Sequence, residues 1–201
     1  ELPDKIEQDV EIDLGETQRQ TYDRAEDEGI VELNAHRESI TVFHVFQLIT
    51  KLRQICNFDP VSGESAKLDQ LLDDLEEIAE SGRKTLVFSQ FVGDDFGLKR
   101  LSKRLPAAYR TMELHGEVSP TARAETVRRF QNDDAVKALL LNFKVGGVGL
   151  NLQAANYVYL FDRWWNPAVE DQAVKRAHRL GQKSVVFVRR FVCRNTIEER
   201  I

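Results

Sequence analysis

The sequence has few of the residues that would build an extracellular or membrane protein. Its 201 residues include two cysteines, Cys56 and Cys193, which are too few for a disulfide scaffold. No stretch approaches the roughly 20 uncharged apolar residues that span a bilayer. We therefore expect an intracellular protein with no membrane partner. The chain starts at Glu1 and its only methionine is Met112, so we also expect it to be part of a longer protein.

Charge is divided unevenly along the chain. Residues 1–80 hold 21 acidic and 7 basic residues, whereas residues 81–201 hold 12 and 21, which gives net charges of −14 and +9. A basic half suggests an anionic partner such as nucleic acid or a nucleotide. Charge alone leaves open the alternative that these residues only form solvated helix faces.

The first sixty residues follow a different pattern from the rest. Residues 10–14 alternate apolar and acidic side chains, as an edge strand does. Residues 17–28 predict a charged helix that stops at Gly29, and residues 39–56 predict a second helix. A turn cluster follows, ending at Pro60. We therefore separate a helical segment, residues 1–60, from a domain formed by residues 61–201.

Predicted helices and strands alternate in that second domain. Ser119 followed by Pro120 is typical of a helix start. This alternation predicts an α/β fold in which helices cover both faces of a parallel sheet. We predict helices at residues 65–81, 95–105, 119–131 and 167–180, and strands at 84–89, 109–114, 138–141, 157–161 and 185–192.

A glycine-rich loop follows the predicted strand 138–141. Its sequence is KVGGVGLNL, from Lys144 to Leu152, and glycines there let the backbone approach a phosphate. The dinucleotide pattern G-x-G-x-x-G fails because Leu152 stands in the third glycine position. The G-x-x-x-x-G-K-[ST] phosphate loop occurs nowhere in the chain. A plain glycine turn between strand and helix remains an alternative.

Three polar residues in the last predicted helix share a helical spacing. Gln172, Arg176 and Arg179 stand at i, i+4 and i+7, which would place them on one face of the helix. Two guanidinium groups beside a glycine loop suit the charge that develops during phosphoryl transfer. The alternative is a basic helix face in solvent. We interpret His178 as a structural residue, and the histidines and cysteines show no metal-ligand spacing.

Other polar residues follow the ends of predicted strands, where parallel sheets bind ligands. Trp164 and Trp165, with the amide of Asn166, could pack against the sheet or contact a nucleic acid strand, and the sequence does not choose between these. Two further pairs offer small polar donors suited to phosphate contacts. They are Ser89-Gln90 and His115-Gly116.

Together these segments closely resemble the carboxyl-terminal helicase lobe of the SWI/SNF-type DNA translocases, a family of superfamily-two DNA-dependent ATPases. The resemblance rests on TLVFSQF at 85–91, LHG at 114–116 with Arg123 and Phe130, GGVGLNL at 146–152, and WWNPAVEDQAVKRAHRLGQ at 164–182. The sequence TIEERI at 196–201 resembles the family's segment just after this lobe. Upstream, residues 2–7 resemble the exit from the first lobe and LRQICN at 52–57 resembles the helical connector.

The resemblance implies a RecA-like fold of the P-loop NTPase type and a mechanism. Two such lobes close on ATP and advance along one strand of duplex DNA, in nucleus, cytoplasm or nucleoid, during chromatin remodelling or DNA repair. The first lobe would bring the phosphate loop and the Mg²⁺ ligands, so we expect this chain alone to be inactive. By motif match, Arg176 and Arg179 are arginine fingers, with Gln172 their partner near the nucleotide. Gly147, Gly149 and Asn151 match the loop that meets the ribose.

The same motif match gives this lobe a DNA-facing set. Ser89, Gln90, His115, Gly116 and Lys144 match positions that face the DNA backbone, and we add Trp164, Trp165 and Asn166 as candidates.

One departure from the family's pattern concerns the glycine loop. Many members carry Ser-Thr where this chain has Asn142-Phe143, so a hydroxyl contact to phosphate would be missing unless Asn142 donates instead. Two alternatives to a translocase lobe remain. The chain could be a DNA- or protein-binding module without ATP turnover, or an unrelated α/β nucleotide-binding enzyme, which the failed glycine pattern disfavours.

Overall fold

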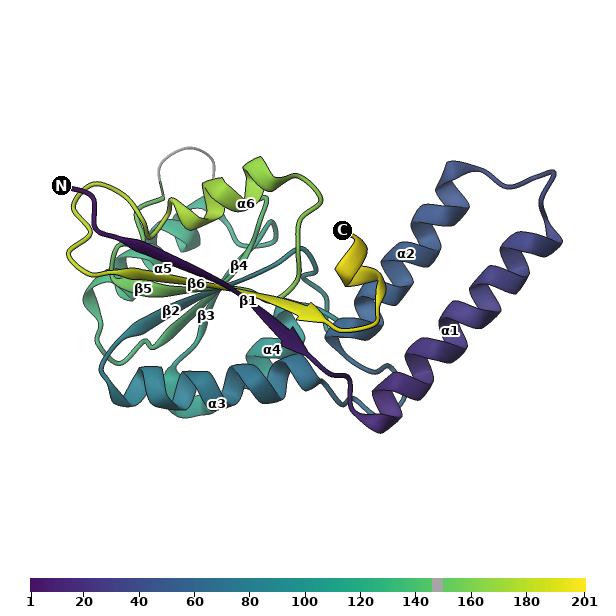
Figure 1. The fold of residues 1–201 in the computed structure, drawn as a ribbon. Helices are drawn as coiled ribbons and strands as arrows, with labels where there is room; N and C mark the ends of the chain where they lie inside the picture. The colour runs from purple at the N-terminus through teal and green to yellow at the C-terminus, as the bar shows by residue number, and fades with distance from the viewer. Residues whose placement is uncertain (146–149) are drawn as a thin grey trace.

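The computed structural model describes residues 1–145 and 150–201, and a six-stranded sheet forms its centre. All paired strands are parallel, and their order is β1-β6-β5-β2-β4-β3 (Figure 1). The predicted α/β fold with a parallel sheet is therefore confirmed. The strands are β1 (Lys5–Ile12), β2 (Lys84–Ser89), β3 (Met112–Leu114), β4 (Ala138–Asn142), β5 (Ala155–Leu160) and β6 (Val186–Cys193).

Helices cover both faces of this sheet. The α-helices are α1 (Glu16–Ala35), α2 (Val42–Asn57), α3 (Ala66–Glu80), α4 (Leu98–Arg104), α5 (Pro120–Asn132) and α6 (Pro167–Val174), and short 3₁₀ helices occupy Ala107–Tyr109 and Ile197–Arg200. In β2, Leu86 and Phe88 join an apolar cluster with α5 and α6, whereas Val87 joins a second cluster with α3 and α4. Successive strand residues point to opposite faces, so the apolar run of β2 fills both clusters.

The predicted edge strand near the amino terminus belongs to the same sheet. β1 pairs with β6 along its whole length, from Lys5 opposite Val186 to Ile12 opposite Cys193. It therefore starts five residues earlier than the predicted strand at residue 10. This part of the 1–60 segment is built into the sheet, and the sequence boundary at residue 60 does not separate it from the lobe.

Helices α1 and α2 form an antiparallel hairpin that projects beyond one end of the sheet (Figure 1). Polar contacts fasten its base to the lobe. The buried Gln18 accepts a hydrogen bond from the Ala66 amide at 3.1 Å, and the Tyr22 hydroxyl accepts one from the Ile197 amide at 2.7 Å. The hairpin thus joins the lobe at both α3 and the carboxyl-terminal segment.

The prediction that the first helix stops at Gly29 is wrong, because α1 continues through it to Ala35. A β-carbon at Gly29 would lie 2.3 Å from Cδ1 of Leu48 on α2. Here glycine allows the two helices of the hairpin to approach each other, so its role is in packing between helices and not in helix termination.

Candidate functional site

A buried carboxylate organises the edge of the sheet where the strands end. Asp162, just after β5, is fully buried and accepts hydrogen bonds from the Gln90 amide at 2.7 Å and from the Asn57 side chain at 2.9 Å. The Ser89 hydroxyl donates to the same carboxylate. Burial raises the pKa of Asp162, and the nearby ammonium of Lys67 opposes that shift. This carboxylate therefore fixes the loops after β2 and β5 relative to α2.

Asn142, at the end of β4, holds the loop after β2 from the other side. Its side-chain amide donates to the carbonyl oxygens of Ser89 and Gln90, each at 3.0 Å, and its oxygen accepts from the Lys144 amide. Both of its donors are therefore used within the protein. The idea that Asn142 could replace a missing phosphate-binding hydroxyl is not supported by this geometry.

The predicted DNA-facing residues divide into accessible and buried side chains. Gln90, Gly116 and Lys144 line one shallow groove of about 340 Å³, together with Arg123. The Lys144 side chain is exposed, and its ammonium lies 5.4 Å from the ring centre of Trp164. The groove thus brings together three residues from three different loops, which is what a surface for phosphate contacts requires.

Ser89 and His115 do not face that groove. Ser89 is fully buried against Asp162, and His115 is 5% exposed, with its Nδ1 accepting from the Glu117 amide at 3.3 Å. We correct the prediction for both residues, because their side chains point into the protein and support their loops.

The structure places the two tryptophans in different environments, so packing on the sheet and contact with a partner no longer apply to both alike. Trp164 packs on Phe143, with ring centres 5.8 Å apart, and so belongs to the core side. Trp165 is 71% exposed. Asn166 caps α6 by accepting a hydrogen bond from the Ala168 amide at 3.0 Å. Trp165 is therefore the one of these three whose side chain is free to meet a partner.

The prediction that one helix carries Gln172, Arg176 and Arg179 is wrong. α6 ends at Val174, so Gln172 lies on the helix and both arginines lie in the turns that follow it. The chain tightens here, because the amide of Arg176 bonds to the carbonyl three residues before it. The Arg176 carbonyl then accepts from the Leu152 amide at 2.9 Å. This contact with the loop before β5 replaces a further helical turn.

Gln182 holds this arginine turn, which we define as residues 175–181. It is buried, and its side-chain nitrogen donates to the carbonyls of Gln153, Ala155 and Ala177 at 3.0–3.1 Å. His178 contacts the Pro3 carbonyl at 2.7 Å, which confirms its interpretation as a structural residue. Gln182, the last residue of the motif, therefore braces the turn against the rest of the lobe.

The two arginines lie close enough to influence each other. Burial lowers the pKa of Arg176, and the positive charge of Arg179 lowers it further. Arg179 donates to the carbonyl of Leu150, in the last part of the glycine loop, at 3.3 Å, and the neighbouring Asn151 is exposed. Gly147 and Gly149 lie outside the described residues. The arginine turn and the end of the glycine loop are thus adjacent, as phosphate binding by both would require.

A second buried hydrogen-bond network, centred on Lys67, could not be predicted from the spacing of residues in the sequence. Lys67 is fully buried and donates to Glu198 at 2.7 Å and to Asn57 at 2.9 Å. Burial alone would lower the pKa of Lys67, but Glu198, the two buried cysteines and Asp162 together outweigh it and raise the pKa. Asn57 bonds both Lys67 and Asp162, so it links the carboxyl-terminal segment to the sheet edge.

Arg53 was also missed as a single residue. It is buried on α2 and donates to the Arg163 carbonyl. It also donates to the side-chain oxygen of Gln90 at 2.8 Å, once the side-chain amide of Gln90 is turned so that its oxygen faces Arg53. Arg53 and Asn57 both belong to the LRQICN motif, so the motif was the available signal and their tertiary contacts supply its physical meaning.

Only one group among the described residues has metal-ligating atoms close together, formed by Cys56, Cys193 and Glu198 within 4.8 Å. Both carboxylate oxygens of Glu198 already accept bonds, one from Lys67 and one from the Cys193 amide. The group therefore does not fit a metal ion. Among the described helices, none is long and apolar enough to cross a membrane.

Comparison with known proteins identifies the family. Residues 64–181 match the helicase conserved C-terminal domain. The whole chain is 38% identical to an uncharacterized ATP-dependent helicase of Mycoplasma pneumoniae and covers 20% of it. About 69% of the chain is 43% identical to the DNA repair protein RAD5B of Arabidopsis thaliana and covers 11% of that protein.

A solved structure extends the match to the fold. The SWI2/SNF2 ATPase core of Sulfolobus solfataricus in complex with dsDNA superimposes with a TM-score of 0.81 and 31% identity, over 98% of this chain and 43% of that one. The chain spans less than a quarter of the length of the curated relatives it matches. It belongs to the helicase C-terminal domain family and is the RecA-like C-terminal lobe of a SWI2/SNF2-type ATPase.

Proposed function

We propose that this lobe supplies Arg176 and Arg179 to the phosphates of ATP in an enzyme that translocates along double-stranded DNA. The observation that carries the proposal is the arginine turn, in which Gln182 braces two neighbouring arginines whose residues contact Leu150 and Leu152 at the end of the glycine loop. Guanidinium groups fixed before the reaction stabilise charge that develops in phosphoryl transfer, and they need no reorganisation at that moment.

The groove of Gln90, Gly116, Arg123 and Lys144 is the proposed contact for the DNA backbone. It lies beside Asp162 and Asn142, which tie the loop carrying Gln90 to the ends of β4 and β5. The solved relative with dsDNA supports this assignment. Contacts of this kind recognise phosphates and not base sequence, as a translocating enzyme requires.

We also propose that the chain on its own does not hydrolyse ATP. Its sequence contains no G-x-x-x-x-G-K-[ST] loop to hold the phosphates. Mg²⁺, which neutralises phosphate charge when bound, would be held by the first lobe. Arginines alone cannot position the attacking water. DNA-stimulated phosphate release by the pure chain that Arg179→Ala abolished would contradict this proposal.

The decisive experiment replaces Arg179 in the full-length parent enzyme. Arg179→Ala should lower DNA-stimulated turnover by a factor on the order of 10³ or more while leaving duplex binding nearly unchanged. Arg179→Lys should rescue poorly, because an ammonium lacks the planar fork. Arg128→Ala is the matched control, since Arg128 is an exposed arginine paired with Glu125 on α5.

The result also separates the translocase from a binding module. If a well-folded Arg179→Ala enzyme kept more than about a tenth of wild-type turnover, the finger assignment would be wrong. If the wild-type parent bound duplex DNA but showed no turnover at all, the lobe would belong to a module that only binds.

A further inference from the structure

The α1–α2 hairpin carries an uncovered row of apolar side chains on α2. Val42, Val45 and Phe46 are 72%, 40% and 61% exposed, and Ile49 is half-buried. These four residues, which we call the apolar stripe, occupy positions i, i+3, i+4 and i+7. That is the spacing by which an amphipathic helix presents one face to a partner. A stripe of this kind is ordinarily covered in a folded protein.

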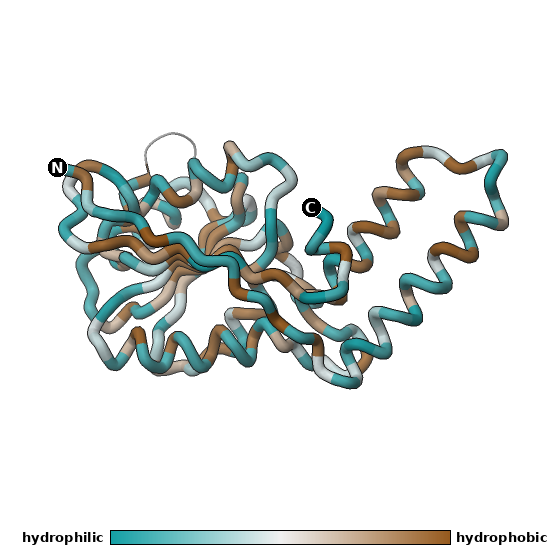
Figure 2. Tube along the Cα trace, viewed as in Figure 1, coloured by the Kyte–Doolittle hydropathy of each residue, from teal (hydrophilic) through white to brown (hydrophobic). Residues whose placement is uncertain are grey.

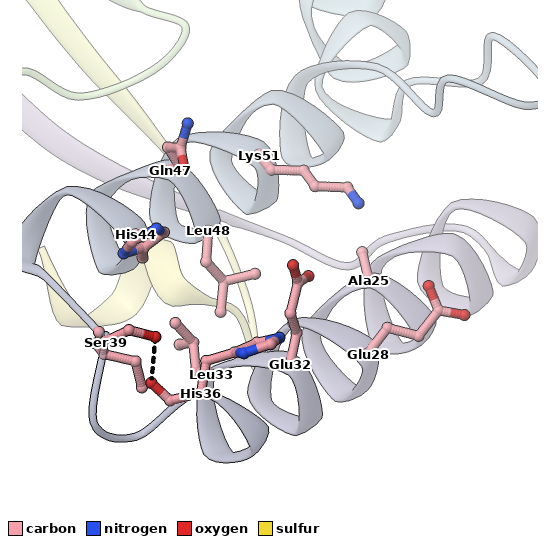
Figure 3. Close-up of a pocket in the computed structure, with 12 residues that line it drawn as sticks. Ala25, Glu28, Glu32, Leu33, His36, Ser39, His44, Gln47, Leu48 and Lys51 are labelled. Carbon is pink, nitrogen blue, oxygen red and sulfur yellow. Dashed lines mark hydrogen bonds between the residues drawn. The ribbon is translucent and has the colours of Figure 1, made fainter.

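The first helix extends the stripe on the same side of the hairpin. Gly29 and Leu48 mark the line where α1 and α2 touch, and in Figure 3 Leu48 points from α2 toward α1. In an antiparallel pair, the residues that follow these two contact points project to the same side. Those residues are Ile30, which is 47% exposed, and Ile49 of the stripe.

Charge on α1 is mostly acidic, although Arg19 pairs with Asp23 at 3.4 Å near the base of the hairpin. α1 carries six acidic and two basic residues, whereas α2 carries no acidic residue. Asp23, Glu26 and Asp27 precede Ile30 by seven, four and three positions, so they share its face of the helix. The apolar stripe is therefore bordered by an acidic row. That row would repel DNA phosphates and anionic lipid surfaces.

We propose that this face of the hairpin binds a partner protein through a basic amphipathic helix. Such a helix would lay its apolar seam along Val42, Val45 and Phe46 and place lysines or arginines against the acidic row. Charge complementarity selects this occupant over a second copy of the chain, since two copies packed face to face would bring their acidic rows together. The surface lies on the projecting hairpin, away from the arginine turn (Figure 1).

Hydropathy along the chain agrees with this placement. Figure 2 shows apolar segments at the outer end of the hairpin and along α2, whereas the turns of α1 nearest the lobe are mostly hydrophilic. A partner helix could dock there without displacing any element of the lobe. The proposal does not depend on the assignment of Arg176 and Arg179, so each can fail alone.

The test uses two synthetic helical peptides of about 21 residues, three heptads with leucine at the a and d positions. One carries lysine at its flanking positions and the other carries glutamate. In fluorescence anisotropy, the lysine peptide should bind the 201-residue chain at least about tenfold more tightly than the glutamate peptide. The double variant Val42→Ser with Phe46→Ser should weaken lysine-peptide binding by about tenfold or more.

Val61→Ser is the matched control, because Val61 is 76% exposed but lies after α2 and outside the hairpin. It should leave peptide affinity unchanged, and thermal melts of all variants should stay near that of the wild type. Lysine-peptide binding that survived the double variant would be non-specific attraction and would overturn the proposal. Equal binding of both peptides would overturn it too. So would self-association of the wild-type chain that the double variant abolishes, which would assign the face to a second copy.

Discussion

Removing the buried ammonium of Lys67 should destabilise the lobe strongly. The side chains of Lys67 and Glu198 are 0% and 1% exposed, with their charged atoms 2.7 Å apart. At an effective dielectric constant of about 20, unit charges at that distance attract by roughly 6 kcal/mol, which desolvation of both groups offsets in large part. Lys67→Met leaves the Glu198 carboxylate buried without its cation, so unfolding should become easier by about 3–5 kcal/mol.

The reasoning is tested by a double-mutant cycle in urea and thermal unfolding. For a chain of this length, that loss corresponds to a fall in melting temperature of about 6–20 °C. Adding Glu198→Gln to Lys67→Met should restore part of the stability, because the amide removes the orphan charge and still accepts from the Cys193 amide. Lys103→Met, which breaks the exposed pair with Asp94, should leave the melting temperature unchanged.

The double variant decides the outcome. If its loss of stability equals the sum of the losses in the two single variants within about 0.5 kcal/mol, the two groups do not interact and the network assignment is refuted.

The pH dependence of stability gives a second check. The pKa of Lys67 is raised above 10.5, so its contribution is complete below that pH and is lost only at higher pH. The wild-type lobe should therefore keep this contribution from about pH 6 to about pH 9. Lys67→Met should destabilise the lobe less at about pH 6 than at about pH 9, because protonation relieves a buried carboxylate that has lost its cation.

Three further outcomes follow from single contacts. Gln182→Ala should lower the free energy of unfolding by at least about 2 kcal/mol, as measured by urea unfolding. Gln182→Glu should lower it further, because a carboxylate would face three carbonyl oxygens. Burial would raise the pKa of Asp59, but hydrogen bonds from Ser62 and the Val61 amide hold it below 3.8. The loss of stability caused by Asp59→Asn should therefore be larger at about pH 7 than at about pH 3. Lys144→Ala should reduce the slope of log duplex affinity against log salt by about 0.9, measured by anisotropy. An unchanged slope would remove Lys144 from the DNA surface.

Elements with local signals were predicted well from the sequence. β2 has the predicted bounds, because turn residues stand on both sides of its apolar run. α5 begins at Pro120 after the Ser119 cap, as predicted, and the Ser119 hydroxyl accepts from the Ala122 amide. Here the caps and turns that set an element's ends lie within a few residues of it, so the sequence alone contains the necessary information.

Predictions failed where distant contacts decide the local structure. Gly29 looks like a helix stop, but Leu48 of α2 explains why a glycine is needed within α1. Ser89 looks like a phosphate ligand at a strand end, but Asp162, 73 residues later, takes its hydroxyl. Neither partner can be identified by spacing, because the first pairing depends on how α1 and α2 pack and the second on how β2 and β5 meet in the sheet.

The long motif at residues 164–182, which carries both arginines, predicts the protein family well but the local backbone geometry poorly. Several of its side chains make hydrogen bonds within the protein. Glu170 is buried and bonds to Arg163 at 2.9 Å, while Gln182 and His178 hold the other end of the segment. A regular helix would need none of these contacts. The motif is long because its residues must hold two like charges close together in a non-helical turn, against their mutual repulsion and the cost of partial burial. With the function proposed for the arginines, substitutions at these supporting residues should therefore impair turnover of the parent enzyme by moving the arginines.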